Sequence, residues 1–121
     1  MICGDGSSIN PTGYDIGMND RLTKLLALHQ ADPSDTFCTY ALAMEAAKLG
    51  RADEAIGWLD KTIALDANQA YAYYHKAKLL AEMDRRADAL KTLDEGLAAA
   101  RRSGDDKALA ELNDLAGLLE A

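Results

Sequence analysis

From residue 20 onwards, apolar residues recur every three or four positions, which is the spacing of one face of an α-helix. Short polar or glycine-containing stretches interrupt this pattern. Asp35 is expected to cap one helix, and Gly50 suits the left-handed turn that ends it, as Asp84 does in the next pair. The pattern therefore predicts an all-α chain of about six helices, over residues 20–32, 36–49, 53–65, 69–83, 87–101 and 105–120.

The predicted helices come in pairs that repeat every 34 residues. Residues 36–69 align with residues 70–103 without gaps, and eight positions are identical. Small residues recur where two helices must approach closely, and larger apolar residues recur where a groove must be filled. Examples are Ala43 with Ala77, Ala55 with Ala89, and Leu59 with Leu93. The same period extends backwards over residues 20–33, which match the second helix of a preceding unit.

The repeat divides the chain into a leader, residues 1–17, and a helical domain, residues 18–121. The leader holds four of the nine glycines and shows no helical period. It is a sequence added for expression, the product of a start site placed too far upstream, or a natural arm; the first two origins are favoured. The domain is expected to comprise a half unit (20–33), two units (36–69 and 70–103) and a capping helix (105–120).

Composition and charge exclude several classes of protein. The chain has 23 Ala, 18 Leu and no Val, which argues against a buried β-sheet. Its 13 Lys and Arg against 20 Asp and Glu leave a net charge of −7, without the basic surface that nucleic acid or an anionic membrane would require. No stretch has the length of a membrane span or the pattern of a secretory signal, so the cytoplasm is the default location.

The sequence offers no catalytic constellation. His29 and His75 are the only histidines, and neither is spaced to act with a nucleophile. Cys3 and Cys38 lack metal-ligand spacing, and Cys38 is expected to be a small buried side chain. The carboxylates fall on helix faces expected to be solvated. We therefore expect no enzyme, no metal site and no cofactor.

A two-helix unit of 34 residues with this pattern resembles the tetratricopeptide repeat family. Residues 49–55 are similar to the family's inter-helix turn, and residues 64–68 to its unit junction, with Ala67 in place of the usual proline. Thr39 stands where the family often has a large aromatic residue, and Thr62 where it often has alanine. The resemblance implies an α–α superhelix, a solenoid of antiparallel helix pairs, in which the first helix of each pair lines a concave side.

The resemblance also implies a non-enzymatic scaffold that binds a peptide or protein segment on this concave face. Five of the seven aromatic residues lie in the two complete first helices, and aromatic and Met side chains suit recognition. Packing between helices is the competing explanation for Tyr40, Tyr71 and Tyr74, although partner binding is favoured. His75 is expected to be a polar residue of the groove. The expected concave residues are Phe37, Tyr40, Ala41, Met44, Tyr71, Tyr74, His75 and Lys78.

Two further expectations concern the kind of partner. Some family members hold a C-terminal carboxylate with Lys and Asn side chains, but Phe37, Ala41, Tyr71 and His75 occupy those places, so this binding mode is not expected. Trp58, on a second helix, is expected on the outer side as a second contact surface.

The alternative function is structural. The half unit leaves an apolar helix face without its partner helix, and this face is covered by the leader, by a second chain, or by neither. If it is exposed, it favours a self-associating subunit and a homo-oligomer. This face carries Leu22, Leu25, Leu26 and Leu28.

Overall fold

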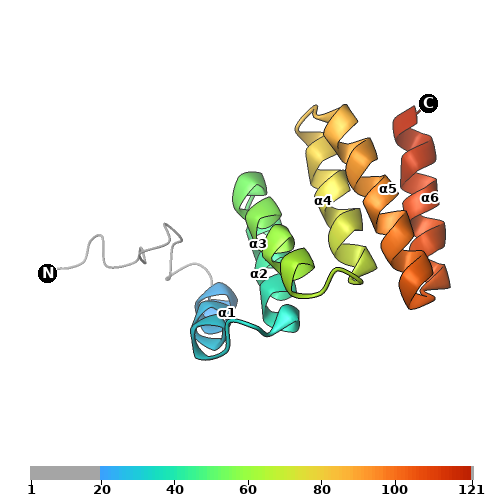
Figure 1. Cartoon of the computed structure of the whole chain (residues 1–121). Coiled ribbons are helices and arrows are strands. Elements are labelled where there is room, and N and C mark those ends of the chain that lie inside the picture. The colour runs from blue at the N-terminus through green and yellow to red at the C-terminus, as the bar shows by residue number, and fades with distance from the viewer. Residues whose placement is uncertain (1–19, 121) are drawn as a thin grey trace, which may run out of the picture.

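The computed structural model describes residues 20–120, which form six α-helices and no strand (Figure 1). The predicted leader lies outside the described residues. The ends of the six helices fall within two residues of the predicted ones, so the all-α prediction is confirmed. The helices are α1 (Asp20–Ala31), α2 (Thr36–Lys48), α3 (Ala52–Leu65), α4 (Ala70–Glu82), α5 (Arg86–Ser103) and α6 (Asp106–Glu120).

The turns between helices repeat in atomic detail. Asp35 caps α2 as predicted, since its carboxylate accepts hydrogen bonds from the main-chain N–H groups of Phe37 and Cys38. Gly50 (φ 76°) and Asp84 (φ 61°) both take the left-handed conformation that ends their helices. After each, an arginine N–H donates to the same carbonyl position: Arg51 to Ala46 at 3.0 Å, and Arg85 to Leu80 at 2.9 Å. The predicted equivalence of the two turns is therefore confirmed.

The helices stand side by side in chain order, with α1 and α6 at opposite ends of the stack (Figure 1). Within a unit, α2 packs on α3 and α4 packs on α5, while α3 against α4 joins the two units. The four repeated alanines are fully buried at these contacts, which is why the backbones can approach closely. They are Ala43, Ala55, Ala77 and Ala89. The molecule is therefore a helical solenoid.

The two departures from the family pattern contact each other. The Thr62 hydroxyl donates a hydrogen bond to the Thr39 hydroxyl oxygen at 2.8 Å, and both side chains are fully buried between α2 and α3. The equivalent residues of the next unit, 34 positions later, are Tyr73 and Gly96. A Cβ atom on Gly96 would lie 2.7 Å from the Cβ of Tyr73, so only glycine fits opposite that ring. The first unit thus fills this space with two threonines, and the second unit fills it with a tyrosine opposite a glycine.

The leucines of α1 are mostly covered. Leu22 and Leu25 are buried in a cluster with Leu42 and other residues of the first unit, and Leu26 packs against the same cluster. Three of the four leucines on this face therefore pack into the core of the first unit. Leu28 alone among the four is exposed, at 59%.

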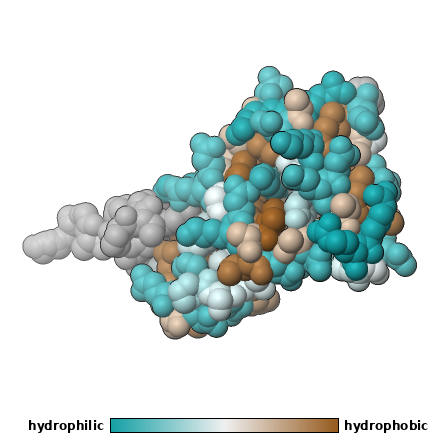
Figure 2. Space-filling model, viewed as in Figure 1, coloured by the Kyte–Doolittle hydropathy of each residue, from teal (hydrophilic) through white to brown (hydrophobic). Residues whose placement is uncertain are grey.

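On the face seen in Figure 2, hydrophobic residues form small patches separated by hydrophilic ones. No helix between residues 20 and 120 combines the length and the apolar character that crossing a membrane requires.

Candidate functional site

Four aromatic rings from α2 and α4 contact one another edge to face, and we call this set the aromatic row. It consists of Tyr40, His75, Tyr74 and Tyr71 in that order. Successive ring centroids are 5.7, 5.3 and 6.3 Å apart. All four side chains are half-buried, so each ring also presents surface to solvent. The structure thus brings together four of the residues that the sequence assigned to the concave face.

Tyr71 joins the row to α6. The Tyr71 hydroxyl donates a hydrogen bond to the Glu111 carboxylate. This bond favours the protonated phenol and, with burial and the Glu111 charge, raises the pKa of Tyr71 to about 12. Tyr71 therefore stays protonated at pH values where an ordinary tyrosine ionises. Sequence reasoning gave Glu111 no role on this face, since α6 lies outside the 34-residue register.

The His75 ring contacts both Tyr40 and Tyr74. Burial lowers the pKa of His75, the nearby Lys78 ammonium lowers it further, and the Glu111 carboxylate opposes both effects. The imidazole is therefore neutral near pH 7. Lys78, also assigned to the concave face, is exposed. The row is thus an uncharged aromatic surface with the Lys78 cation beside it and the Glu111 carboxylate bound to Tyr71.

Met44 and Ala41, also predicted on the concave face, do not belong to the aromatic row. Met44 is half-buried and, with Tyr40, packs against a small cluster of Ala43, Leu59 and Ala72. Ala41 is buried and offers little surface to a partner.

Phe37 is 73% exposed and does not join the aromatic row. Instead it lines a hollow of about 420 Å³ between α1 and the start of α2, together with Leu25 and Leu28. Arg21 and Lys24 complete the lining. Phe37 is therefore part of a separate apolar surface.

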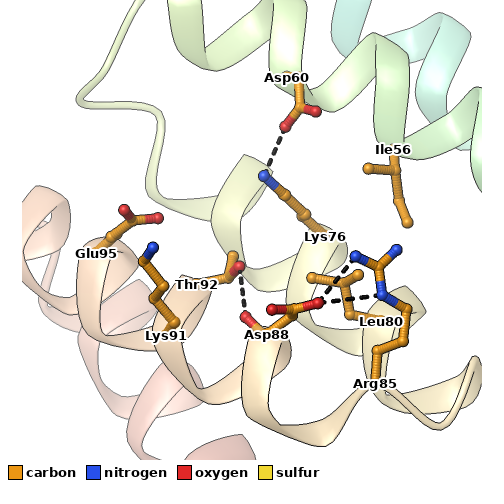
Figure 3. A pocket seen from close by; sticks show the side chains of 9 residues that line it. All are labelled: Ile56, Asp60, Lys76, Leu80, Arg85, Asp88, Lys91, Thr92 and Glu95. Atoms are coloured by element: carbon orange, nitrogen blue, oxygen red, sulfur yellow. Dashed lines mark hydrogen bonds and ion pairs between the residues drawn. The ribbon is translucent and has the colours of Figure 1, made fainter.

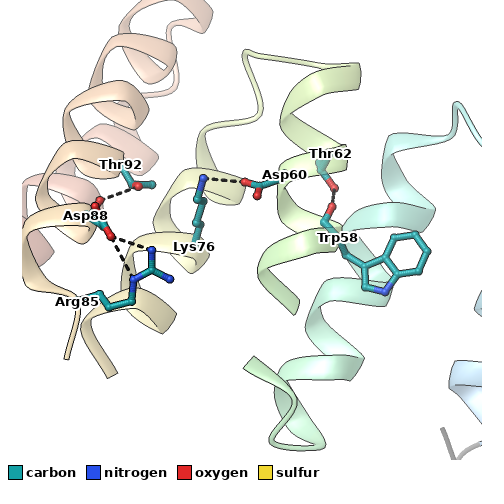
Figure 4. Close-up of polar contacts among 7 residues, drawn as sticks. All are labelled: Trp58, Asp60, Thr62, Lys76, Arg85, Asp88 and Thr92. Atoms are coloured by element: carbon teal, nitrogen blue, oxygen red, sulfur yellow. Dashed lines mark hydrogen bonds and ion pairs between the residues drawn. The ribbon is translucent and has the colours of Figure 1, made fainter. Parts of the chain in front are cut away.

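Trp58 projects from α3 on the side away from Asp60 (Figure 4). The His29 ring meets it edge to face at 4.9 Å, and the Lys61 ammonium lies 4.9 Å from its ring centroid. Trp58 is half-buried, so it fills the space between α1 and α3 while keeping some exposed surface. The idea that this surface makes a second contact stays a prediction.

A second hollow, of about 440 Å³, lies among α3, α4 and α5 (Figure 3). Lys76 pairs with Asp60 at 2.7 Å, and Arg85 pairs with Asp88 at 2.8 Å (Figures 3 and 4). Within each pair the two charges neutralise each other. The first pair links α4 to α3, and the second links the turn between α4 and α5 to α5. The sequence analysis did not identify this hollow. Its lining is Ile56, Asp60, Lys76, Leu80, Arg85, Asp88, Lys91, Thr92 and Glu95.

Among residues 20–120, no three His, Cys, Asp or Glu side chains gather in a way that could hold a metal ion. Cys38 is buried, as predicted, and its thiol donates a hydrogen bond to the Leu25 carbonyl at 3.1 Å. Burial raises the pKa of the Cys38 thiol, and the charges of Asp35 and Asp32 raise it further. The thiol therefore stays protonated and has a structural place in the core.

The sequence matches no model of a known protein family, and no curated protein matches it. Several solved protein structures are similar to it. The tetratricopeptide repeat domain protein of Salinibacter ruber is 36% identical, with a TM-score of 0.68, over 72% of this chain and 98% of that chain.

Two other solved structures are similar. The TPR2B domain of yeast Sti1, in its complex with pHsp70, is 25% identical with a TM-score of 0.77, over 82% of this chain and 79% of that one. The Yersinia enterocolitica type III secretion translocator chaperone SycD shares the fold at 17% identity, with a TM-score of 0.77, over 84% of this chain and 70% of that one. Together with the 34-residue helix pairs, the match to the Salinibacter protein shows that the chain belongs to the tetratricopeptide repeat family.

Proposed function

We propose that this protein is a non-enzymatic interaction scaffold that binds a peptide or protein segment across the aromatic row. The observation that carries the proposal is the row itself: four half-buried rings from two successive units, each in edge-to-face contact with the next. Rings held in this way present a large contact area and lose little conformational entropy on binding. The partner-binding residues proposed are Tyr40, Met44, Tyr71, Tyr74, His75 and Lys78.

Two features support this proposal. The interior of the stack consists mostly of small and aliphatic side chains, and the tyrosines of the row pack against it while keeping exposed surface. The yeast Sti1 domain with the same fold was solved in a complex with pHsp70, which supports a protein as the partner. Phe37, although predicted as part of this surface, lies outside the row and is not included.

We expect the triple variant Tyr40→Ala, Tyr71→Ala, Tyr74→Ala to weaken a protein partner's binding at least about 10- to 100-fold, since buried aromatic anchors carry most of an interface's energy. A partner isolated with the full chain would be purified and its dissociation constant measured against each variant. Circular dichroism would check that the variants remain helical.

If the triple variant unfolds, the same dissociation constant is measured with the single variant Tyr74→Arg, which leaves the other rings in place and should also weaken binding. Lys91→Ala, on α5 in the second hollow, is the control and should bind as wild type does. A helical triple or Tyr74→Arg variant with wild-type affinity for the partner would exclude the row as the binding surface.

A second candidate function, self-association through α1, is favoured by one observation. Leu28 and Phe37, 59% and 73% exposed, converge on the same apolar hollow. In the complete units, the residues equivalent to Leu28 are Thr62 and Gly96, and both are buried by the first helix of their own unit. The hollow is therefore open where a helix of a second copy would complete the packing.

This candidate predicts a concentration-dependent increase in the mass of the full chain above that of a monomer, measured by sedimentation equilibrium. Leu28→Glu is expected to make the protein monomeric, because it places a charge in the hollow. Leu65→Glu, which alters a leucine 44% exposed at the end of α3, is the matched control and should leave the mass unchanged. A wild-type protein that stays monomeric at all concentrations would rule out self-association.

A further inference from the structure

The apolar hollow beside α1 lies where the complete units have a first helix. Four residues of α1 line it, and each is followed at the 34-residue period by one residue of α3 and one of α5. The equivalents of Leu28 are Thr62, which bonds to Thr39, and Gly96, whose Cβ would touch Tyr73. Both therefore face the first helix of their own unit, and α1 lacks a helix in the same position. The lining residues of α1 are Arg21, Lys24, Leu25 and Leu28.

At the opposite end of the stack, α6 packs in the way that a first helix does. It begins 36 residues after α4. Towards the preceding unit, α4 turns Ala72, Leu79 and Lys76, which pairs with Asp60. Residues 20–120 therefore start with a second helix that lacks a first one and finish with a first helix that lacks a second one. The residues of α6 that stand 36 positions later pack in the core shared with α4 and α5: Ala108, Leu112 and Leu115.

The same alignment locates the face of α6 that a second helix would cover. In α4, Tyr73 and Ala77 meet α5. Their equivalents in α6 are Leu109, which is half-buried, and Asn113, which is exposed. If α1 of a second copy lay against α6 as α5 lies against α4, its Leu28 would meet Leu109 and cover this face.

The charges of the two faces are complementary. The helices of a unit run antiparallel, so the end of the first lies beside the start of the second (Figure 1). In a joined pair, Glu120 at the end of α6 would therefore lie beside the first two turns of α1, which carry Arg21 and Lys24. All three residues are exposed, and the Arg21 side chain stays 64% exposed although it pairs with Glu45 at 2.8 Å. Opposite charges thus meet at this contact between copies whose net charge of −7 otherwise makes them repel each other.

We infer that the hollow receives α6 of a second copy, so that copies join head to tail. This inference rests on the second candidate function, self-association, and names the surface that the hollow binds. Because α1 and α6 lie at opposite ends of the stack, two copies cannot form the contact twice (Figure 1). Each added copy leaves one hollow and one α6 face open, and the assembly therefore grows beyond a dimer.

The test is sedimentation equilibrium of the full chain and of two variants that each block one face. Leu28→Glu blocks the hollow. Asn113→Arg places bulk and a positive charge on α6, opposite Arg21 and Lys24 of the next copy, and should weaken association at least about 10-fold. An equimolar mixture of the two variants should form a 1:1 dimer and nothing larger, because only one hollow and one α6 face remain open. Ala64→Arg adds the same charge at an exposed alanine of α3 and is the control, which should associate as wild type does.

Four results would overturn the inference: a full chain that stays monomeric at all concentrations, a wild-type mass that stops at a dimer, a helical Asn113→Arg variant that associates as wild type does, or a mixture of the two variants that stays monomeric. The first of these also excludes self-association, whether the leader or nothing covers the hollow. Loss of association in Leu28→Glu but not in Asn113→Arg would retain self-association through α1 and exclude α6 as its partner. Binding of a partner at the aromatic row is tested separately, since no residue of the row belongs to either face.

Discussion

Gly96→Ala is expected to lower the free energy of unfolding by up to about 2 kcal/mol, although alanine is the better helix former. The new Cβ would lie 2.7 Å from the Cβ of Tyr73 and 3.1 Å from the Leu112 side chain. The Tyr73 Cβ is fixed to the backbone of α4, so α4 and α5 must move apart. Overpacking of this kind costs about 1–3 kcal/mol, which helix propensity offsets by about 1.

Gly57→Ala is the matched control. Gly57 also lies within a helix, α3, but a Cβ there would have no atom within 4 Å. The substitution should therefore raise the free energy of unfolding by about 0.5–1 kcal/mol through helix propensity alone. Urea denaturation of both variants measures the two effects, which have opposite signs. Equal stabilisation by both substitutions would show that the close contact of Gly96 with Tyr73 does not exist.

Thr39→Tyr combined with Thr62→Gly is expected to be more stable than the sum of the two single variants by at least about 1 kcal/mol. Thr39→Tyr alone forces a large ring against Thr62, which costs about 1–3 kcal/mol. Thr62→Gly alone loses a buried hydrogen bond and leaves a void between α2 and α3, a cost of about 2 kcal/mol. Together the two changes install the Tyr73–Gly96 arrangement of the second unit. The introduced phenol hydroxyl would lie near the Pro33 carbonyl, as the Tyr73 hydroxyl lies near that of Ala67.

The coupling energy comes from urea denaturation of the wild type, both single variants and the double variant. The control cycle pairs Thr39→Tyr with Gly96→Ala, which lie in different units and should be additive within about 0.5 kcal/mol. Additivity of Thr39→Tyr and Thr62→Gly would mean that the two units do not use equivalent positions to fit their helices together.

The sequence was sufficient to predict the helices and turns, because those depend on local chemistry. Apolar spacing located the helices, and the left-handed turns at Gly50 and Asp84 followed from the residues themselves. Likewise, the close packing at Ala43 and Ala77 follows from side-chain size at a fixed period.

Side-chain directions at the two ends of the stack were harder to predict. The last residue of α3, Leu65, corresponds to position 99, but α5 continues to Ser103, so α6 falls outside the 34-residue register. For that reason the contact of Glu111 with Tyr71 could not be read from the period.

Phe37 shows a second reason why the sequence did not predict the direction of a side chain. Its equivalent, Tyr71, packs on Tyr74, and the residue equivalent to Tyr74 is Tyr40. Phe37 lies next to α1 instead, where Leu25 and Leu28 offer apolar surface. A rotamer choice between two apolar neighbours depends on the three-dimensional position of α1, which the repeat does not specify.

The order of the helices in the stack has a thermodynamic consequence. Each helix packs mainly on the helices before and after it, as α2 does on α3 and α3 on α4. The free energy of such a molecule is close to a sum of unit terms and nearest-neighbour terms, as in a one-dimensional array. Opening therefore starts where neighbours are fewest, at α1, which packs mainly on α2. The contact of Tyr71 with Glu111 reaches past α5 to α6, so it joins α4, α5 and α6 into one group of helices that is expected to open together.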